Sequence, residues 1–318
     1  MPETIDILNA IVLFSNYVLV PALAYGSQLA LGALGVTLVF GILRFANFSH
    51  GDLMAFGTTI TILFTWLLQS WGVSAGFLPT GLIAMIPAIV VTAVVAIIID
   101  KLVFSFYRKR RAAPVVLVIA SVGVMFMLGG IVRFIMGTDD RRFADGERFV
   151  VHPLQFRSWS GLDEGLAIQT TQAVTFAVAI VVVIALFAFL GYSRTGKAMR
   201  AYSDNEDLAL LSGINPDRIV LVTWILAAAL ATVAGALYGL DKSFHPFTYL
   251  QLLLPIFASA ILGGIGQPVG AVVGGYVVAF SEVMLTYAYK RFFGYLLPED
   301  MAPEGLVQFL STDYKFAI

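Results

Sequence analysis

Apolar residues run along this chain in long, almost unbroken stretches that are separated by short polar segments. A helix that crosses a bilayer needs about 20 mostly apolar residues. The pattern therefore predicts an all-α fold, a polytopic membrane helix bundle with eight spans in a single domain covering residues 1–318. The predicted spans are residues 24–42, 53–70, 78–100, 114–136, 172–192, 219–240, 250–265 and 269–289.

Two apolar segments leave alternatives open. The seventh predicted span is short and contains Pro255, which is typical of a broken or re-entrant helix that lines protein or water. Residues 5–21 could form an extra span, an interfacial helix or the outer part of the first span, with the helix broken at Pro21 and Gly26.

Composition agrees with a membrane protein. Hydrophobic residues make up 59% of the chain and charged residues 12%, and the mean hydropathy is +0.89, so most of the surface must face lipid. The net charge of −1 provides no basic surface for nucleic acid, which we do not expect as a partner. The chain has no cysteine, and its three histidines are far apart in sequence, so we predict no metal site.

The distribution of Lys and Arg predicts the orientation. Lys101 and the four basic residues at 108–111 follow the third span with no acid among them, which places that loop in the cytoplasm. Alternation of the spans then puts the polar loop of residues 193–218 in the cytoplasm as well. The loop of residues 137–171 lies outside, where its mixture of acidic and basic residues predicts an ordered external surface.

Small residues at four-residue spacing predict close helix packing in two places, because they allow backbones to approach each other. One series lies on the sixth span and the other enters the eighth. A simpler reading is that glycine is common in membrane helices in general. The positions are Ala227, Ala231, Gly235 and Gly239 in the first series, and Gly266, Gly270 and Gly274 in the second.

The cytoplasmic loop of residues 193–218 contains the signals of a short helix. Ser203 and Glu206 have the spacing of a capping box, and Asp207 favours the positive end of the helix dipole. Gly213 suits a left-handed C-terminal cap. The sequence therefore predicts an amphipathic helix of about two turns.

Leu208 and Leu211 fall on one side of this predicted helix, and Arg200 precedes it. Such a helix could transmit force from a cytoplasmic motor, although an ordinary solvated connector would show the same spacing. We include Arg200 with the capping residues and the two leucines in one predicted docking set.

Four sequence segments together resemble a known family. They are Phe-Gly-Ile-Leu-Arg-Phe-Ala-Asn-Phe-Ser-His-Gly-Asp at 40–52, Arg-Thr-Gly-Lys-Ala at 194–198, Asp-Leu-Ala at 207–209 with Gly213, and Leu-Gly-Gly-Ile-Gly-Gln-Pro-Val-Gly-Ala at 262–271. In order and spacing they resemble the membrane subunits of bacterial ATP-binding-cassette importers for branched-chain amino acids and related small polar solutes. The chain is most similar to the shorter of the two permease subunits.

The resemblance implies a multi-pass subunit of the bacterial inner membrane. It implies four kinds of protein partner: a second, homologous permease subunit, two cytoplasmic ATPase subunits and a periplasmic solute-binding protein. ATP and Mg would be bound by the ATPase subunits, so this chain is expected to be neither an enzyme nor a cofactor-binding protein. Members of the family usually have one more apolar span, which would be a ninth span beyond Ile318.

Two other function classes were weighed on the residues alone. Residues 191–197 match the opening of a phosphate-binding loop, but Ala198 replaces the Ser or Thr that would hold magnesium, and a membrane helix precedes it instead of a strand. A self-contained secondary transporter or channel stays the alternative. Inverted repeats would favour that class, and the sequence shows no convincing internal repeat.

Three polar residues are candidates for the solute pathway or its gate. Asn47 and His50 lie in a polar cluster at the cytoplasmic end of the first span, where a capped helix start is the structural alternative. Glu282 falls near the middle of the eighth span. An acid at that depth needs a partner or water, so a paired structural carboxylate is the alternative there.

The predicted orientation can be tested with single cysteines, because the chain has none of its own. Ser158→Cys should react with a membrane-impermeant thiol reagent in intact cells, and Ser203→Cys should be protected. Labelling of both variants from outside would overturn the orientation that residues 108–111 predict.

Overall fold

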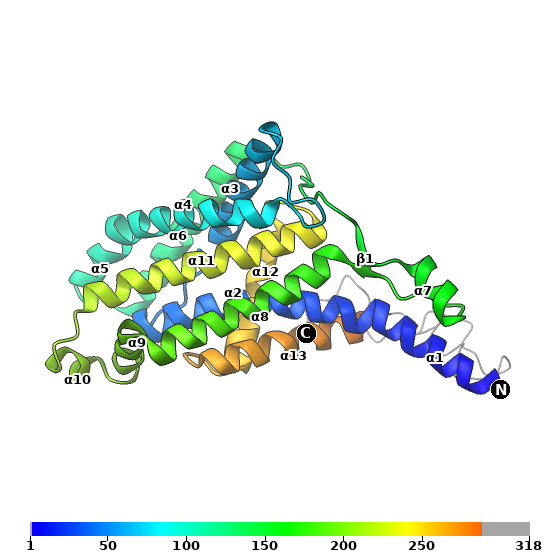
Figure 1. The fold of residues 1–318 in the computed structure, drawn as a ribbon. Helices are drawn as coiled ribbons and strands as arrows, with labels where there is room; N and C mark the ends of the chain where they lie inside the picture. The colour runs from blue at the N-terminus through cyan, green and yellow to red at the C-terminus, as the bar shows by residue number, and fades with distance from the viewer. Residues whose placement is uncertain (1, 288–318) are drawn as a thin grey trace.

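The computed structural model describes residues 2–287, with side chains from residue 7 (Figure 1). The longer helices are α1 (Pro2–Phe14), α2 (Val20–Leu43), α3 (His50–Ser70), α4 (Gly81–Ile99), α6 (Pro114–Met136), α8 (Thr170–Tyr192), α9 (Arg194–Asp204), α11 (Pro216–Lys242), α12 (Thr248–Leu262) and α13 (Pro268–Thr286). The shorter elements are the π-helical turns η1 (Ser15–Leu19) and η2 (Asp100–Phe104), the helices α5 (Ser105–Lys109), α7 (Pro153–Ser160) and α10 (Glu206–Leu211), and the antiparallel strands β1 (Phe149–Val151) and β2 (Ile168–Gln169).

The nearly all-α membrane bundle that the sequence predicts is confirmed. Within the described residues, seven helices are long and apolar enough to cross a bilayer, and α12 is a shorter apolar helix of 15 residues. Helices suit these apolar segments because a helix satisfies its own backbone hydrogen bonds in lipid. The short α12 contains Pro255 and corresponds to the irregular seventh predicted span. The end of the eighth predicted span, at 288–289, and the expected ninth span lie outside the described residues.

The expected breaks at Pro21 and Gly26 are wrong, because α1, η1 and α2 form one continuous helix. In the π-helical turn the Val20 N–H donates to the carbonyl of Ser15, five residues earlier. The α-helical hydrogen-bond pattern is therefore already interrupted directly before Pro21, where proline lacks an N–H donor. Gly26 is a packing position. A Cβ there would be 2.5 Å from the ring of Tyr276 in α13.

Helix α2 lies in the centre of the bundle and packs against α13, α11, α12 and α8. Figure 1 shows α9 and α10 at one end of the bundle and α1 projecting at the other. The contacts of α2 depend on its glycines. A Cβ on Gly32 would be 2.7 Å from Ile256 in α12, and one on Gly35 would be 2.5 Å from the ring of His50 in α3.

Most of the predicted small-residue series lie at helix contacts. Ala227 and Ala231 are fully buried, and Cβ atoms on Gly235 and Gly239 would come within 3.1 Å of α3 side-chain atoms. In the second series, Cβ atoms on Gly270 and Gly274 would overlap the carbonyl oxygens of Gly263 and Ser259 respectively.

Gly266 does not belong to this packing surface, contrary to the sequence prediction. It lies in the turn before α13 with φ of +85°, and no described atom lies within 4 Å of a Cβ built on it. Its spacing from Gly270 is four residues, but α13 begins only at Pro268, so the two positions do not share a helix face.

Two asparagines join the N-terminal helix to the loop of residues 137–171. The Asn16 side chain donates to the Gly165 carbonyl (2.7 Å) and accepts from the Ala167 N–H (2.8 Å). The Asn9 side chain accepts from the Glu164 N–H at 3.1 Å. Asn16 lies within η1, and a π-helical turn shifts the direction of the side chains that follow it. These bonds give the loop a fixed position on the helix.

The small-residue contacts lead to a direct test of packing. Gly274→Ala should lower stability by about 1–3 kcal/mol, because its Cβ would overlap a backbone carbonyl that cannot move independently. Gly123→Ala is the matched control, since no described atom lies within 4 Å of that position in α6. Removing this helical glycine should leave stability equal or raise it by about 0.5–1 kcal/mol. Thermal unfolding of the purified protein in detergent measures both, and equal midpoints would contradict the packing assignment.

Candidate functional site

The polar loop after α8 forms two consecutive helices, α9 and α10. The Ser193 side chain caps α9 by accepting from the Gly196 N–H at 2.8 Å. A Cβ on Gly196 would overlap the Phe189 carbonyl, so the chain turns sharply here from the membrane helix into α9. The Arg-Thr-Gly-Lys segment at 194–197 is therefore the start of a helix and not a phosphate-binding loop.

The predicted capping box of Ser203 and Glu206 is wrong. Ser203 lies in the last turn of α9, and its hydroxyl donates to the Gly41 carbonyl at 3.1 Å. The residue that caps α10 is Asn205, whose extended backbone lets its side chain accept from the Leu208 N–H at 3.0 Å. Ser203 cannot act as the cap because α9 continues past it to Asp204.

Helix α10 presents apolar side chains to the outside. Leu208 is 61% exposed and Leu211 is 85% exposed, whereas Ala209 between them is 3% exposed. The helix ends at Gly213, whose φ of +80° is the left-handed conformation expected for its C-terminal cap. Exposed leucines on a rigid, capped helix are typical of a surface that another protein covers.

Two contacts fix this loop to the bundle, and a third joins its two helices. Arg44, in a left-handed conformation at the end of α2, donates to the Ser203 carbonyl, and Ser203 in turn donates to Gly41. The buried Tyr202 hydroxyl donates to the Glu206 carboxylate at 2.6 Å and so joins α9 to α10. Burial and this carboxylate raise the pKa of Tyr202 well above its usual value, which keeps the hydroxyl a donor.

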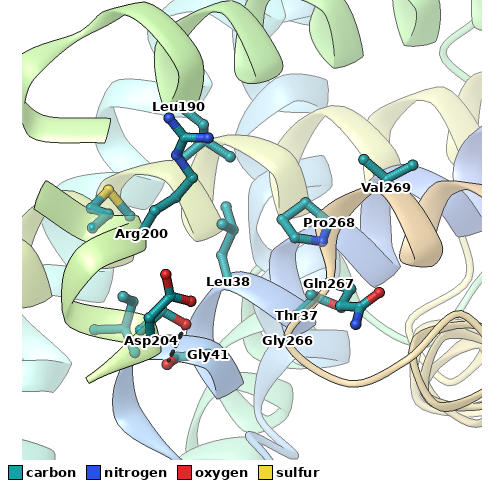
Figure 2. A pocket seen from close by; sticks show the side chains of 13 residues that line it. Thr37, Leu38, Gly41, Leu190, Arg200, Asp204, Gly266, Gln267, Pro268 and Val269 are labelled. Carbon is teal, nitrogen blue, oxygen red and sulfur yellow. Dashed lines mark hydrogen bonds between the residues drawn. The ribbon is translucent and has the colours of Figure 1, made fainter. Parts of the chain in front are cut away.

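Beneath α9 lies a cavity of about 330 Å³. Figure 2 shows Arg200 and Asp204 of α9 on one side of it and Pro268 and Val269, at the start of α13, on the other. The side chain of Leu38 in α2 lies between them. The cavity therefore lies between α9, the end of α2 and the start of α13.

Asn47 and His50 lie inside the bundle and not at its cytoplasmic end, contrary to the sequence prediction. The ring of His50 contacts α2 at Gly35, which is about 12 Å along the helix from its end at Leu43. The chain thus turns back into the bundle before α3 begins. The side chain of Asn47 accepts from both the N–H and the hydroxyl of Ser49, at 3.2 and 2.7 Å. These contacts are those of a structured helix start.

His50 is completely buried, and its ring faces the Gly32 carbonyl of α2. Helix α12 begins beside it. A Cβ on Gly51 would be 2.7 Å from the Tyr249 carbonyl, and the Tyr249 hydroxyl donates to the Gly235 carbonyl at 3.0 Å. The N-termini of α3 and α12 therefore meet within the bundle.

Asp52 and Arg133 form a charged contact that the sequence analysis did not single out. Asp52, in the first turn of α3, is 7% exposed and interacts electrostatically with Arg133 of α6. The guanidinium of Arg133 also lies 5.3 Å from the ring of Phe247, just before α12. An arginine inside the fourth predicted span was the available signal, but its partner comes from another helix.

Asp100 is a second buried charge that the sequence analysis missed. It accepts from both guanidinium nitrogens of Arg108 (2.8 and 3.1 Å) and from the indole N–H of Trp224 (2.8 Å). Arg108 was counted in a basic cluster without acids. The structure pairs it with the acid one residue before that cluster, because η2 and α5 bring positions eight residues apart together.

Glu282 lies about one turn before the end of α13 at Thr286, and not at the middle of the helix as predicted. Its carboxylate hydrogen-bonds the Tyr25 side chain of α2 and interacts with Tyr238 of α11. The acid therefore has partners on two other helices, as its structural interpretation requires.

The family of the chain follows from comparison with known proteins. Residues 18–304 match the family described as "Branched-chain amino acid transport system / permease component". The chain belongs to this family of multi-pass transport permeases.

Particular relatives agree with this assignment. The chain is 30% identical over 263 residues to the high-affinity branched-chain amino acid transport system permease protein LivH of Escherichia coli, covering 81% of this chain and 82% of the relative. It is 30% identical to the corresponding permease protein BraD of Pseudomonas aeruginosa, covering 83% and 84%. A probable branched-chain amino acid transport permease protein of Methanocaldococcus jannaschii is 29% identical, covering 86% and 82%.

The contact between Glu282 and Tyr25 yields a test of the role of the acid. Glu282→Gln keeps a hydrogen-bonding side chain, so assembly and uptake should stay within about twofold of wild type. Glu282→Leu leaves the buried tyrosine hydroxyl without its acceptor, which should cost about 1–3 kcal/mol and reduce the yield of assembled protein. Size-exclusion yield and solute uptake measure the two effects. A glutamine variant that assembles fully but does not transport would instead assign the charge to the solute pathway.

Proposed function

We propose that this chain is the permease subunit of an ATP-binding-cassette importer. With a related permease subunit it forms the path for branched-chain amino acids or a similar small polar solute, delivered by a periplasmic binding protein. Two cytoplasmic ATPase subunits bind ATP and Mg and drive the cycle. The observation that carries the proposal is the exposed apolar face of α10, held rigidly on the bundle of a chain from a transport permease family.

In this proposal α10 is the part that contacts an ATPase subunit. Leu208 and Leu211 supply the apolar contact, and the exposed side chain of Asp207 supplies charge beside it. Arg200, which the sequence placed in the docking set, lines the cavity beneath α9. Gly213 and Asn205 give α10 its length and direction.

Ser203 and Glu206 have a different role from the one that the sequence suggested. Both connect the docking helix to the bundle through Gly41 and Tyr202. A displacement of α10 by the ATPase would therefore reach the end of α2, which packs against four other long helices.

We propose that the interior candidates mainly hold the helices in position. Asn47 fixes the turn before α3, and the His50 ring fills the space that Gly35 leaves. Glu282 holds α13 against α2. Opening of the path would have to move these contacts, so they lie at positions where a gate could act.

The docking role of α10 predicts that Leu208→Asp with Leu211→Asp uncouples ATP hydrolysis from uptake. Burial of a leucine at an interface contributes about 1.5–3 kcal/mol, so loss of both should reduce uptake at least about tenfold. The protein should still insert in the membrane, because both side chains face away from the bundle.

The conservative pair Leu208→Met with Leu211→Met is the control, since it keeps an apolar surface of similar volume and should keep uptake. Uptake and binding-protein-stimulated ATPase activity of the assembled complex are measured in proteoliposomes. Wild-type values for both in the aspartate pair would exclude α10 as the docking helix.

A further inference from the structure

The cavity beneath α9 has the size and lining of a small-molecule site. Its volume of about 330 Å³ lies at the lower end of the range for ligand pockets, roughly 300–1,000 Å³. Its wall combines aliphatic side chains with a few polar groups, as ligand pockets do. The aliphatic lining is Leu38, Ile42, Leu190 and Met199.

Two opposite charges face this cavity from the same helix. Arg200 and Asp204 are four residues apart on α9, which puts them on one face within reach of each other. In the part of the chain that the structure describes, no ion pair joins them. Figure 2 shows the guanidinium extending toward Leu190 and the carboxylate lying near Gly41. Both charges are therefore available to a ligand.

The opposite wall favours an anionic group. It is formed by Gln267, Pro268 and Val269 at the N-terminus of α13. Pro268 has no N–H and the Gln267 N–H donates to the Gly264 carbonyl at 3.0 Å. The N–H groups of Val269 and Gly270 in the first turn have no partner within the helix, and that end of the dipole is positive. A carboxylate placed between Arg200 and this helix end would be attracted from two sides.

We propose that this cavity binds an aliphatic α-amino acid. Arg200 and the start of α13 hold its carboxylate, Asp204 holds its ammonium group, and the aliphatic lining holds its side chain. An anionic lipid headgroup fits less well because the Asp204 carboxylate would repel it. The ammonium and carboxylate groups of an α-amino acid are both bonded to the α-carbon, so they are close enough to reach two side chains one helical turn apart.

Occupancy of the cavity would act on the docking loop. The ligand would bridge α9, α2 and α13, and α9 leads directly into α10. A bound amino acid would hold α9 in the position seen here and oppose its displacement by the ATPase. Amino acid accumulated on the docking-loop side would thereby inhibit its own import. This regulatory step rests on the proposed function, whereas binding in the cavity does not.

Binding is tested on the complex purified with its partner subunits but without the binding protein, by calorimetric titration with L-leucine. We expect saturable binding that Arg200→Gln and Asp204→Asn each weaken about tenfold, the effect of losing one charge-assisted hydrogen bond. Arg218→Gln and Asp217→Asn are matched controls, because they alter exposed charges at the start of α11, outside the lining. Val269→Trp, which fills the cavity from the opposite wall, should also abolish binding.

Leucine analogues distinguish the possible sources of affinity. Neither 3-methylbutylamine, which lacks the carboxylate, nor 4-methylpentanoate, which lacks the amine, should bind as leucine does. Equal binding of 4-methylpentanoate and leucine, with no effect of Asp204→Asn, would overturn the proposal in favour of a simple anion site. Absence of leucine binding, or competition for the cavity by phosphatidylglycerol alone, would also overturn it.

Regulation is tested separately in proteoliposomes with leucine on the docking-loop side. Wild-type ATPase activity should fall at least about threefold at saturating leucine, and Asp204→Asn should lose this response relative to its own activity without leucine. Leucine that binds in the cavity without changing ATPase activity would refute the regulatory step alone. Uptake at zero internal leucine reports on the proposed import function independently of both results.

Discussion

Close approach of backbones to α2 is the interaction on which the arrangement of the other helices depends. Apolar side chains gain little by packing together within lipid, so membrane helices associate through dense packing and hydrogen bonds. Each of four glycines along α2 leaves space for a side chain from a different helix. Tyr276 of α13, Ile256 of α12, His50 of α3 and Ser203 of α9 lie against Gly26, Gly32, Gly35 and Gly41, in that order.

This arrangement connects the docking loop with the interior of the bundle. Gly41 accepts the hydrogen bond from α9, and two turns away Gly35 receives the ring that marks the start of α3. A shift of α2 would therefore change contacts at the surface and at the meeting point of α3 and α12 together. The polar side chains buried there include Asn47 and His50.

The cavity under α9 lies beside the hydrogen bond that joins α9 to α2. One of its walls is α9, which leads into the proposed docking helix α10, and the others belong to α2, α8 and the start of α13. A ligand held there by two charges would stiffen the joint, whereas an empty cavity leaves room for α9 to move. Coupling and feedback would then both act through α9, which the hydrogen bond of Ser203 joins to Gly41 of α2.

The sequence alone determined the membrane class, the apolar segments and the position of the polar loop that contains α9 and α10. These follow from the length of apolar runs and from local turn chemistry, which depend only on neighbouring residues. Gly213 is a case in point, since a left-handed helix end is a local requirement. The small residues of α11 were also visible, because helical periodicity places them on one face.

Only the tertiary structure determined the features that depend on where a helix begins or ends and on which other helix it contacts there. Asn205 and not Ser203 caps α10 because α9 continues through Ser203 to Asp204. Gly266 left the packing series because α13 starts after it. His50 lies deep in the bundle, and Asp52 meets Arg133, because the chain turns back after α2 to a level set by packing on its glycines. These boundaries and depths depend on contacts between segments that are distant in the sequence, which the local pattern of residues did not reveal.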